Sequence, residues 1–344
     1  MKIGPLVLIG ALLAPLGCQP ADTPTVESPD SGFPESTTPN QPTTDGGAPT
    51  TSGNDEGPES PHASSGGTDR STQAQGSDSG ETRYLRQAGN EDDARVETAI
   101  AHFERDDGVK VDLFAEVHIA EPSHYAEVQQ RLQDYEAVLY ELVANPGDLP
   151  TAGAASVEDR SILSAIQGRI GSVMGLGFQL SELDYHQDNF VHADFTPRQF
   201  AEAMEAGGET PWTLVLKAMS GSSSRSDLED ANFQIEPIDF VAAARSGQLG
   251  LAWRKQLTQI LLQMNVVQDM LSGTVLLDGR NRKAVDVLKE QIELGKKTFA
   301  IHYGGAHMPG IEQILTEELR FRRTGTDWVC AWGLTADAMP AENR

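Results

Sequence analysis

Apolar residues fall into three regions with different patterns along this 344-residue chain. Ile3 to Leu13 is a short, nearly continuous apolar run. Between Gln19 and about Asp92, large apolar side chains are almost absent, and Ser, Thr, Pro, Gly, Asp and Glu dominate. From about Asp93 onward, apolar residues recur at regular intervals, as they do in folded domains. This last part, about 250 residues long, can bury one sizeable hydrophobic core.

Strand-like and helix-like patterns alternate in the folded part. We predict strands at Val109–Phe114, Ala137–Val143, Lys297–His302 and Trp328–Trp332. We predict helices at Ala94–Asp106, His124–Tyr135, Ser161–Met174, Arg198–Ala206, Trp212–Met219, Leu251–Leu271, Asn281–Leu294 and Ile311–Leu319. A strand, a short helix and a second strand within about 35 residues match the size of a βαβ unit. The predicted fold class is therefore α/β, with a mixed, largely parallel central sheet flanked by helices, a mostly helical middle insertion and two related strand-turn-helix halves.

The N-terminus resembles the signal peptide of a bacterial lipoprotein. A short positive segment precedes the apolar run, which is too short to span a bilayer. Pro15-Leu16-Gly17 then leads directly to Cys18. The resemblance implies a signal peptide at 1–17, cleavage before Cys18 and lipidation of Cys18, which would hold the protein on a membrane. Ordinary secretion with cleavage nearby is the alternative. Gln19 after the cysteine, where Asp is typical of inner-membrane retention, favours the outer membrane.

Residues 18–92 are predicted to form a lipidated, disordered acidic tether. Their composition cannot bury enough apolar surface to offset the entropy of ordering the chain. An extended tether would carry the remaining domain, residues 93–344, away from the membrane surface.

The charge balance excludes one class of partner. The chain has 51 acidic and 26 basic residues, for a net charge of −25, whereas nucleic-acid binding requires clustered Lys and Arg. The two cysteines, Cys18 and Cys330, provide no disulfide framework once Cys18 is lipidated. Because Cys330 stands between Val329 and Ala331, we predict a small buried residue rather than a nucleophile.

Two histidines follow the ends of predicted strands and precede helices. These are His118 and His307, and Glu141 lies near the end of a third strand. The carboxyl ends of neighbouring parallel strands form the ligand-binding edge of a sheet, so we expect the three side chains to converge. Two imidazoles and a carboxylate suit Zn, Mn or Co and leave positions for water. The alternative is that each histidine is a structural group at a strand end.

Two segments resemble the motif blocks of the TraB/PrgY/GumN family, which includes the Tiki ectodomains. The first is AEVHIAEPSHYAEVQQRLQDYEAVLYELV, and the second is GRNRKAVDVLKEQIELGKKTFAIHYGGAHMPG. The second contains the family's Gly-x-x-His in full, from Gly304 to His307. In the first, Ala115 stands where the family has Gly. A glycine there would permit a positive φ or a close approach of the backbone, which alanine does not. The resemblance spans about Val109–Leu319, although the middle matches only in character.

The resemblance implies a mixed α/β domain and specific roles for several residues. His118, His307 and Glu141 match the metal-binding positions, and Arg280 matches the Arg before the second block. Arg280 would hold a carboxylate of the substrate or of Glu141, or form a structural salt bridge. Related esterase-like and haem-lipoprotein families carry Glu two residues before the first His, so Glu116 is a candidate second ligand or general base. Of Glu141 and Glu116, one would hold the ion with the two histidines, and the other would act as the general base.

We accordingly expect a cell-envelope lipoprotein with a metal-dependent hydrolase domain of the Tiki type, acting on a peptide or small molecule. Within this family the described activities are metal-dependent proteolysis in the Tiki branch and pheromone shutdown in the TraB/PrgY branch. The alternatives are a non-catalytic module that binds a peptide, haem or metal, and a surface scaffold in which the tether matters most.

The other histidines carry weaker expectations. His124 is expected on the surface and His302 between layers of the fold. His186 and His192 flank a polar stretch near Asp184, Asp188 and Asp194, where a metal loop and an ordinary acidic loop are both open.

Overall fold

The computed structural model describes residues 84–145, 147–150, 173–210, 238–263, 268 and 271–340. The predicted signal peptide, Cys18 and the predicted tether up to residue 83 lie outside the described residues. The last part of that tether is folded, because Leu85–Ala88 pairs with the strand that begins at Arg95, so the predicted boundary between tether and domain at residue 92 is wrong. So do the predicted helix Trp212–Met219 and most of the predicted helix Ser161–Met174. Within the described part of the chain, no helix has both the length and the apolar character needed to cross a membrane.

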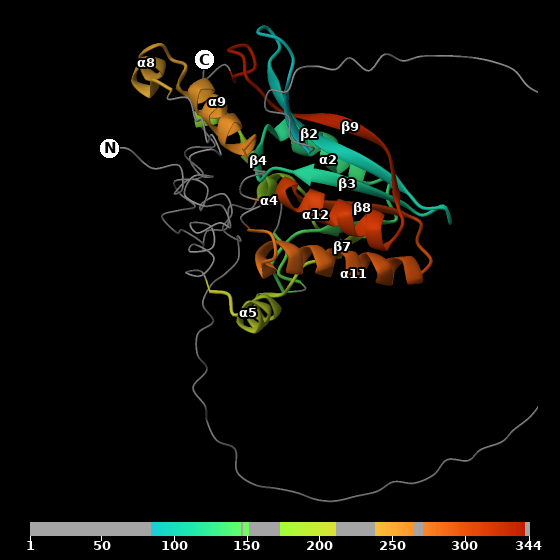
Figure 1. Cartoon of the computed structure of the whole chain (residues 1–344). Coiled ribbons are helices and arrows are strands. Elements are labelled where there is room, and N and C mark those ends of the chain that lie inside the picture. The colour runs from blue at the N-terminus through green and yellow to red at the C-terminus, as the bar shows by residue number, and fades with distance from the viewer. Residues whose placement is uncertain are drawn as a thin grey trace, which may run out of the picture. The chain divides into compact units, whose positions relative to one another are not determined.

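A mixed sheet forms the centre of the folded part (Figure 1). Its seven described strands are β1 Leu85–Ala88, β2 Arg95–Glu104, β3 Lys110–Glu116, β5 Ala137–Tyr140, β7 Phe190–His192, β8 Thr298–Gly304 and β9 Arg322–Gly333. They follow the order β1-β2-β3-β8-β5-β7, and β9 pairs with the other side of β2. Strands β3, β8, β5 and β7 are parallel, whereas β1, β3 and β9 each pair with β2 antiparallel. The α/β fold with a mixed sheet is therefore confirmed.

Strand β8 lies between β3 and β5, although it comes more than 150 residues after them in the chain. It pairs in parallel with β3 from Lys110↔Thr298 to Glu116↔Gly304, and with β5 from Ala137↔Phe299 to Tyr140↔His302. The connection from β3 to β5 thus passes over the position that β8 fills. This change in strand order is the arrangement that creates a crevice at the carboxyl ends of the strands.

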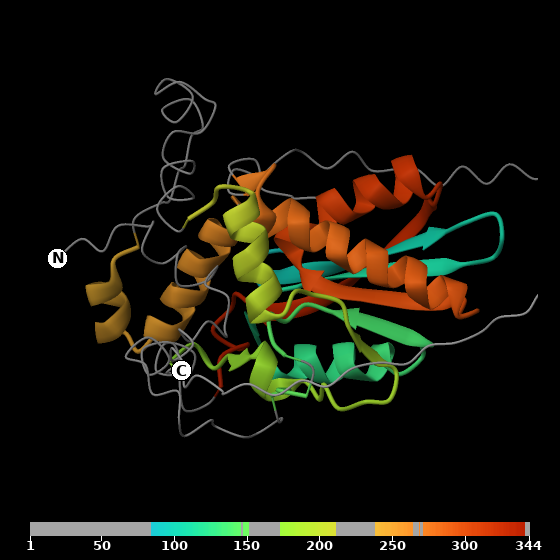
Figure 2. The same cartoon turned by 90° about the horizontal axis from the view of Figure 1, so that it is seen from below.

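Helices cover both faces of the sheet. Helix α2, Pro122–Leu132, lies on one face, and α11, Arg280–Glu293, and α12, Met308–Gln313, lie on the other (Figure 2). On the α11 side, Leu113 and Ile301 belong to the same core as Leu288. On the α2 side, the core contains Phe114 and Val128. Because both faces are covered, side chains of either parity along the central strands are buried.

The remaining described elements lie largely around the strand ends. They are β4 Ile119–Ala120, β6 Gly177–Phe178, α4 Gln179–Glu182, α5 Pro197–Ala206, α8 Phe240–Arg245, α9 Leu249–Leu261, a 3₁₀ turn Gly305–His307 and π-helical turns Val275–Gly279 and Ile314–Glu318. Strands β4 and β6 pair as a separate small sheet. Figure 2 shows α5 and α9 at the end of the sheet where β8 ends. The N-cap that begins α5 is Thr196, which forms a capping box with Gln199, and Pro197 follows at the first helical position.

Most predicted elements are present, with one clear error. The predicted strands correspond to β3, β5, β8 and β9, and the predicted helices to α2, α5, α9, α11 and α12. The prediction of a helix at Ala94–Asp106 is wrong, because this segment is strand β2, paired on both sides. Helix α9 also ends at Leu261 rather than at Leu271. The middle region was predicted to be mostly helical, with a polar loop at Tyr185–Val191. Its described part includes the short strands β6 and β7, and β7 begins within that loop.

Candidate functional site

The three predicted donors converge at the carboxyl ends of the parallel strands. His118 follows β3, Glu141 follows β5, and His307 ends the 3₁₀ turn that follows β8. Gly304, the last residue of β8, lies among them. A Cβ atom placed on Gly304 would be 3.2 Å from Glu141 Oε2, 3.8 Å from His307 Cδ2 and 3.9 Å from His118 Nε2. The strand order therefore brings together side chains that are nearly 190 positions apart in the sequence.

Amide oxygens hold the two imidazoles in matching orientations. His118 Nδ1 lies 2.8 Å from Gln179 Oε1, and His307 Nδ1 lies 2.7 Å from Asn281 Oδ1. Gln179 donates its Nε2–H to the Tyr185 hydroxyl at 3.0 Å, which leaves its oxygen to face His118. Since an amide oxygen only accepts, each histidine donates from Nδ1. In the neutral imidazole, the Nε2 lone pair then remains available, near Gly304 in His118 and 3.5 Å from Glu141 Oε1 in His307.

Glu141 is held as an ionised carboxylate. Its Oε1 atom lies 2.8 Å from Arg280 Nη2 and 3.5 Å from His307 Nε2, and its Oε2 atom accepts the Gly304 N–H at 2.6 Å. Burial alone would raise the pKa of Glu141. The positive charge of Arg280 outweighs burial and holds this pKa well below its ordinary value.

Arg280 binds two carboxylates of the protein itself. Besides Glu141, it contacts Asp194 through two hydrogen bonds, one from Nε at 3.0 Å and one from Nη2. Among the alternatives left open for Arg280, this geometry favours a salt bridge to Glu141 over a contact with a substrate carboxylate. The neighbouring carboxylates outweigh burial and raise the pKa of the guanidinium further.

Sequence reasoning missed three of these contacts. Gln179 and Asn281 orient the imidazoles, and Asp194 is the second partner of Arg280; all three are buried. The sequence could have indicated Asn281, because it is the second residue of the Arg-Asn pair in the second motif block. No comparable pattern marks Gln179, which reaches His118 from 61 positions away.

Glu116 does not join this group. Its Oε1 atom lies 2.9 Å from His124 Nε2, and its Oε2 atom lies 2.9 Å from His302 Nε2. The side chains of all three residues are at most 1% exposed. Because both of its oxygens are engaged away from His118 and His307, the geometry does not support a role for Glu116 as second ligand or general base.

The donor set at Gly304 fits a divalent ion in its chemistry. Two imidazole Nε2 atoms and an ionised carboxylate are the protonation states that metals bind, and ligating histidines usually donate their other N–H to an oxygen, as these do. The spacing is not that of a preformed site, since the described ranges contain no group of three or more His, Cys, Asp or Glu arranged to hold a metal ion.

Two expectations about individual residues are wrong. His124 was expected on the surface, but the first turn of α2 faces the sheet and His124 is buried. Cys330 was expected to be buried, but it is exposed, because Val329 and Ala331 point to the opposite side of strand β9. His302 is buried between layers, as predicted.

The polar stretch around His186 and His192 is structural in this geometry. His192 donates its Nε2–H to the carbonyl of Leu142 at 2.7 Å, and Asp184 accepts the backbone N–H of His186 at 3.0 Å. Asp194 binds Arg280, so His192, Asp184 and Asp194 each have a different partner and do not converge on one point. The ordinary acidic loop is therefore the better description of the two alternatives.

Ala115 is compatible with the local backbone. In the described part of the chain, Arg320 is the non-glycine residue with a positive φ, so Ala115 does not need the conformational freedom of Gly. It pairs with Tyr303 of β8 and its side chain belongs to the core on the α11 side.

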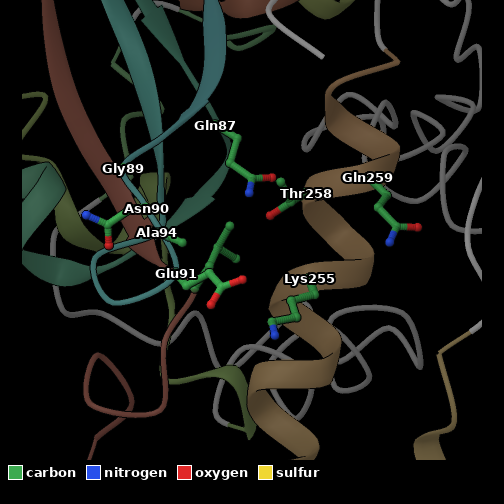
Figure 3. A pocket seen from close by; sticks show the side chains of 9 residues that line it. Gln87, Gly89, Asn90, Glu91, Ala94, Lys255, Thr258 and Gln259 are labelled. Atoms are coloured by element: carbon green, nitrogen blue, oxygen red, sulfur yellow. The ribbon is translucent and has the colours of Figure 1, made fainter. Parts of the chain in front are cut away.

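A separate hollow of about 760 Å³ lies between the β1–β2 turn and helix α9 (Figure 3). Its lining residues are Gln87, Gly89, Asn90, Glu91, Ala94, Lys255, Thr258, Gln259 and Leu334. Figure 3 shows Lys255 and Glu91 on its opposite walls. None of the residues that converge on Gly304 lines this hollow, so we treat it as distinct from the candidate site.

Comparisons with protein-family models, curated proteins and solved structures find no match for this chain.

Proposed function

We propose that this chain is a cell-envelope hydrolase that uses a divalent metal ion, Mn, Co or Zn, to cleave an amide or ester bond, with peptides as the first substrate class to test. One observation carries the proposal: His118, Glu141 and His307 converge on Gly304, and amide oxygens engage Nδ1 of both imidazoles, so Nε2 of each ring is the nitrogen left to bind an ion. The resemblance of the two motif blocks to the TraB/PrgY/GumN family points in the same direction.

In this proposal His118, His307 and Glu141 would hold the ion. When bound, the ion would polarise a carbonyl group and lower the pKa of a water molecule. The surrounding residues prepare the donors for it. Gln179 and Asn281 accept a hydrogen bond from Nδ1 of His118 and His307, so in the neutral imidazoles the proton lies on Nδ1 and Nε2 is the nitrogen that would bind the ion.

Arg280 and Gly304 act on the carboxylate. Arg280 keeps Glu141 ionised and orients Oε1, while the Gly304 N–H holds Oε2. Asp194 in turn fixes the guanidinium plane of Arg280 through two hydrogen bonds. Glu116 receives no proton-transfer role, since two histidines occupy its oxygens.

The envelope location rests on the sequence around Cys18, which lies outside the described residues. If Cys18 is lipidated, the mature protein will fractionate with membranes and incorporate labelled palmitate. The Cys18→Ser variant will then lose the label and appear in the soluble fraction. Unchanged fractionation of this variant would contradict the lipid anchor.

A non-catalytic binding module is the second candidate, and one observation favours it. Both oxygens of Glu141 already have protein partners, Arg280 and Gly304, and the described residues hold no preformed three-ligand metal site. Such a centre could capture a ligand through the imidazole Nε2 atoms without turning it over.

Metal analysis of the purified full chain separates the two candidates. We expect about one bound divalent ion per chain after incubation with Zn²⁺ or Mn²⁺ and gel filtration. The variants His118→Ala and His307→Ala should lose it with unchanged circular dichroism, whereas His186→Ala, an exposed matched control, should keep it. Cleavage of a fluorogenic peptide and ester panel that disappears in the same two variants supports the hydrolase. Metal binding without turnover supports the binding module, and absence of both overturns the proposed function.

A further inference from the structure

We propose that Glu116, together with His124 and His302, positions His118 at the end of β3. This inference rests on the proposed function, because His118 is one of its donors. Glu116 is the last residue of β3, two positions before His118. Its role would be to fix the backbone from which the His118 side chain projects.

The three residues link separate segments of the fold. His302 belongs to β8, the parallel neighbour of β3, and His124 lies in the first turn of α2. Each donates from Nε2 to a different oxygen of Glu116, at 2.9 Å. His124 also donates from Nδ1 to the carbonyl of Cys330 on β9, at 3.2 Å. Glu116 therefore ties the end of β3 to one helix and two strands.

The hydrogen bonds define where the protons are. The Cys330 carbonyl and the Glu116 carboxylate only accept, so His124 must carry a proton on both nitrogens. His302 Nδ1 is buried and has no hydrogen-bond partner among the described residues, so His302 takes part in this group through Nε2 alone. Burial disfavours the ionised forms, but the mutual attraction outweighs it, raising the pKa of His124 and lowering that of Glu116.

Stability alone is a poor explanation for such a group. A buried ion pair is often no more stabilising than apolar residues of the same volume, because both charges lose their hydration. Buried ionic groups are best attested where they fix one geometry among several. The segment whose geometry this group could fix is the one directly after Glu116.

Contacts on both sides of Val117 connect the group to His118. Glu116 Oε1 accepts the backbone N–H of Val117 at 2.8 Å, and Tyr125 donates its hydroxyl to the Val117 carbonyl at 3.0 Å. The carbonyl of His118 accepts from the backbone N–H of Gln179 at 3.1 Å, and Gln179 also holds the His118 ring. The carboxylate of Glu116 thus holds the N–H of Val117, and Tyr125 holds the carbonyl of the peptide group that joins Val117 to His118.

Glu116→Gln in the full chain tests this role. The amide has one accepting oxygen in place of two, so it cannot accept from both histidines and hold Val117 as the carboxylate does. We expect the wild-type protein, free of metal, to show His118 and His307 as Nδ1–H tautomers in long-range ¹H–¹⁵N imidazole spectra. In Glu116→Gln, His118 should become a mixture of tautomers while His307 stays unchanged, and Zn²⁺ affinity measured by calorimetry should fall roughly 10- to 100-fold.

Glu97→Gln is the matched control. Glu97 is also a buried strand carboxylate, but it lies on β2 and pairs with Arg86 of β1 and Arg95 of β2. It should leave the His118 tautomer and Zn²⁺ affinity at their wild-type values. If Glu116→Gln fails to fold, His302→Gln, which keeps an N–H donor, should retain the wild-type His118 signal, and His302→Leu should lose it.

An unchanged His118 signal in a folded Glu116→Gln or His302→Leu variant would overturn the positioning role. So would equal changes at His118 and His307, which indicate general loosening. The tautomer is read without metal or substrate. A wild-type protein that binds no Zn²⁺ would therefore refute the metal-dependent function and leave the test of Glu116 intact.

Discussion

Replacing Arg280 with methionine leaves the carboxylates of Glu141 and Asp194 buried without their cation. The side chains of Arg280, Glu141 and Asp194 are only 8%, 10% and 0% exposed. Removing one partner of a buried ion pair typically costs about 3–5 kcal/mol, because the remaining charge has neither water nor a counter-ion. Since two carboxylates lose their partner together, we expect the free energy of unfolding to fall by about 5 kcal/mol, the upper end of that range.

Arg282→Met provides the comparison on the same helix. Arg282 pairs with Glu318, but these side chains are 52% and 44% exposed, and exposed pairs contribute about 0–1 kcal/mol. Urea unfolding of the full chain, followed by far-ultraviolet circular dichroism, measures both variants. Equal losses in Arg280→Met and Arg282→Met would refute the reasoning, because burial of the carboxylates would then carry no cost.

The effect of Arg280→Met should also depend on pH. In the wild type the pKa of Glu141 is lowered, so its ionised form stabilises the fold at neutral pH, and this contribution is lost as the pH falls through that pKa. Without Arg280, burial dominates and the pKa of Glu141 lies above its unfolded value of about 4.3. In the variant, protonation of Glu141 as the pH falls therefore removes the free-energy cost of burying its charge. The stability difference between wild type and variant should narrow from pH 7 to pH 5, and a constant difference would contradict the assignment.

Two further predictions concern Gly304 and Cys330. A methyl group at Gly304 would lie 3.2 Å from Glu141 Oε2, so Gly304→Ala should lower Zn²⁺ affinity about tenfold. Gly305→Ala, whose methyl group meets only ordinary contact at 3.7 Å, should leave the affinity unchanged in the same calorimetric titration. Burial of its thiol raises the pKa of Cys330 to about 11 although the residue is exposed, so iodoacetamide at pH 8 should alkylate it roughly 100-fold more slowly than free cysteine. Measured in a Cys18→Ser background, a rate equal to that of the urea-unfolded chain would contradict this.

The error at strand β2 has a physical cause. Val96, Ile100 and Phe103 are spaced as on one face of a helix, and this spacing alone predicts one. In the structure β2 pairs on both sides and is covered on both faces, so even Glu97 and Thr98 are buried. Burial on both faces removes the alternation that identifies a strand, and only the partner strands decide its conformation.

Strand parity explains the error at Cys330. The prediction took its flanking Val329 and Ala331 as signs of a buried environment. In a strand, however, the neighbours of a residue point to the opposite face, so two buried neighbours predict an exposed Cys330. The strand at Trp328–Trp332 was itself predicted, so the same pattern contained the correct answer.

The candidate site was predictable only where strand ends mark it. His118, Glu141 and His307 each follow a strand, and the parallel arrangement brings such positions to one edge. The hydrogen-bond partners follow no such rule. Gln179 comes from α4 and Asp194 follows β7, and both reach the site through the chain's path in the middle region, which apolar periodicity does not specify. Sequence pattern thus predicted the donors, and only the packed structure reveals what orients them.

The strand order makes the site dependent on the C-terminal segment. Gly304, His307, Arg280 and Asn281 all lie within residues 280–307, whereas His118 and Glu141 come from residues 118–141. Strand β8 must enter between β3 and β5 before Glu141 can accept the Gly304 N–H. Before β8 is in place, the core also lacks its central strand. Ile301 of β8 packs in the same core as Leu113 of β3 and Leu139 of β5. The same docking step therefore completes the hydrophobic core and assembles the charged centre, so a chain that ends before β8 would have neither.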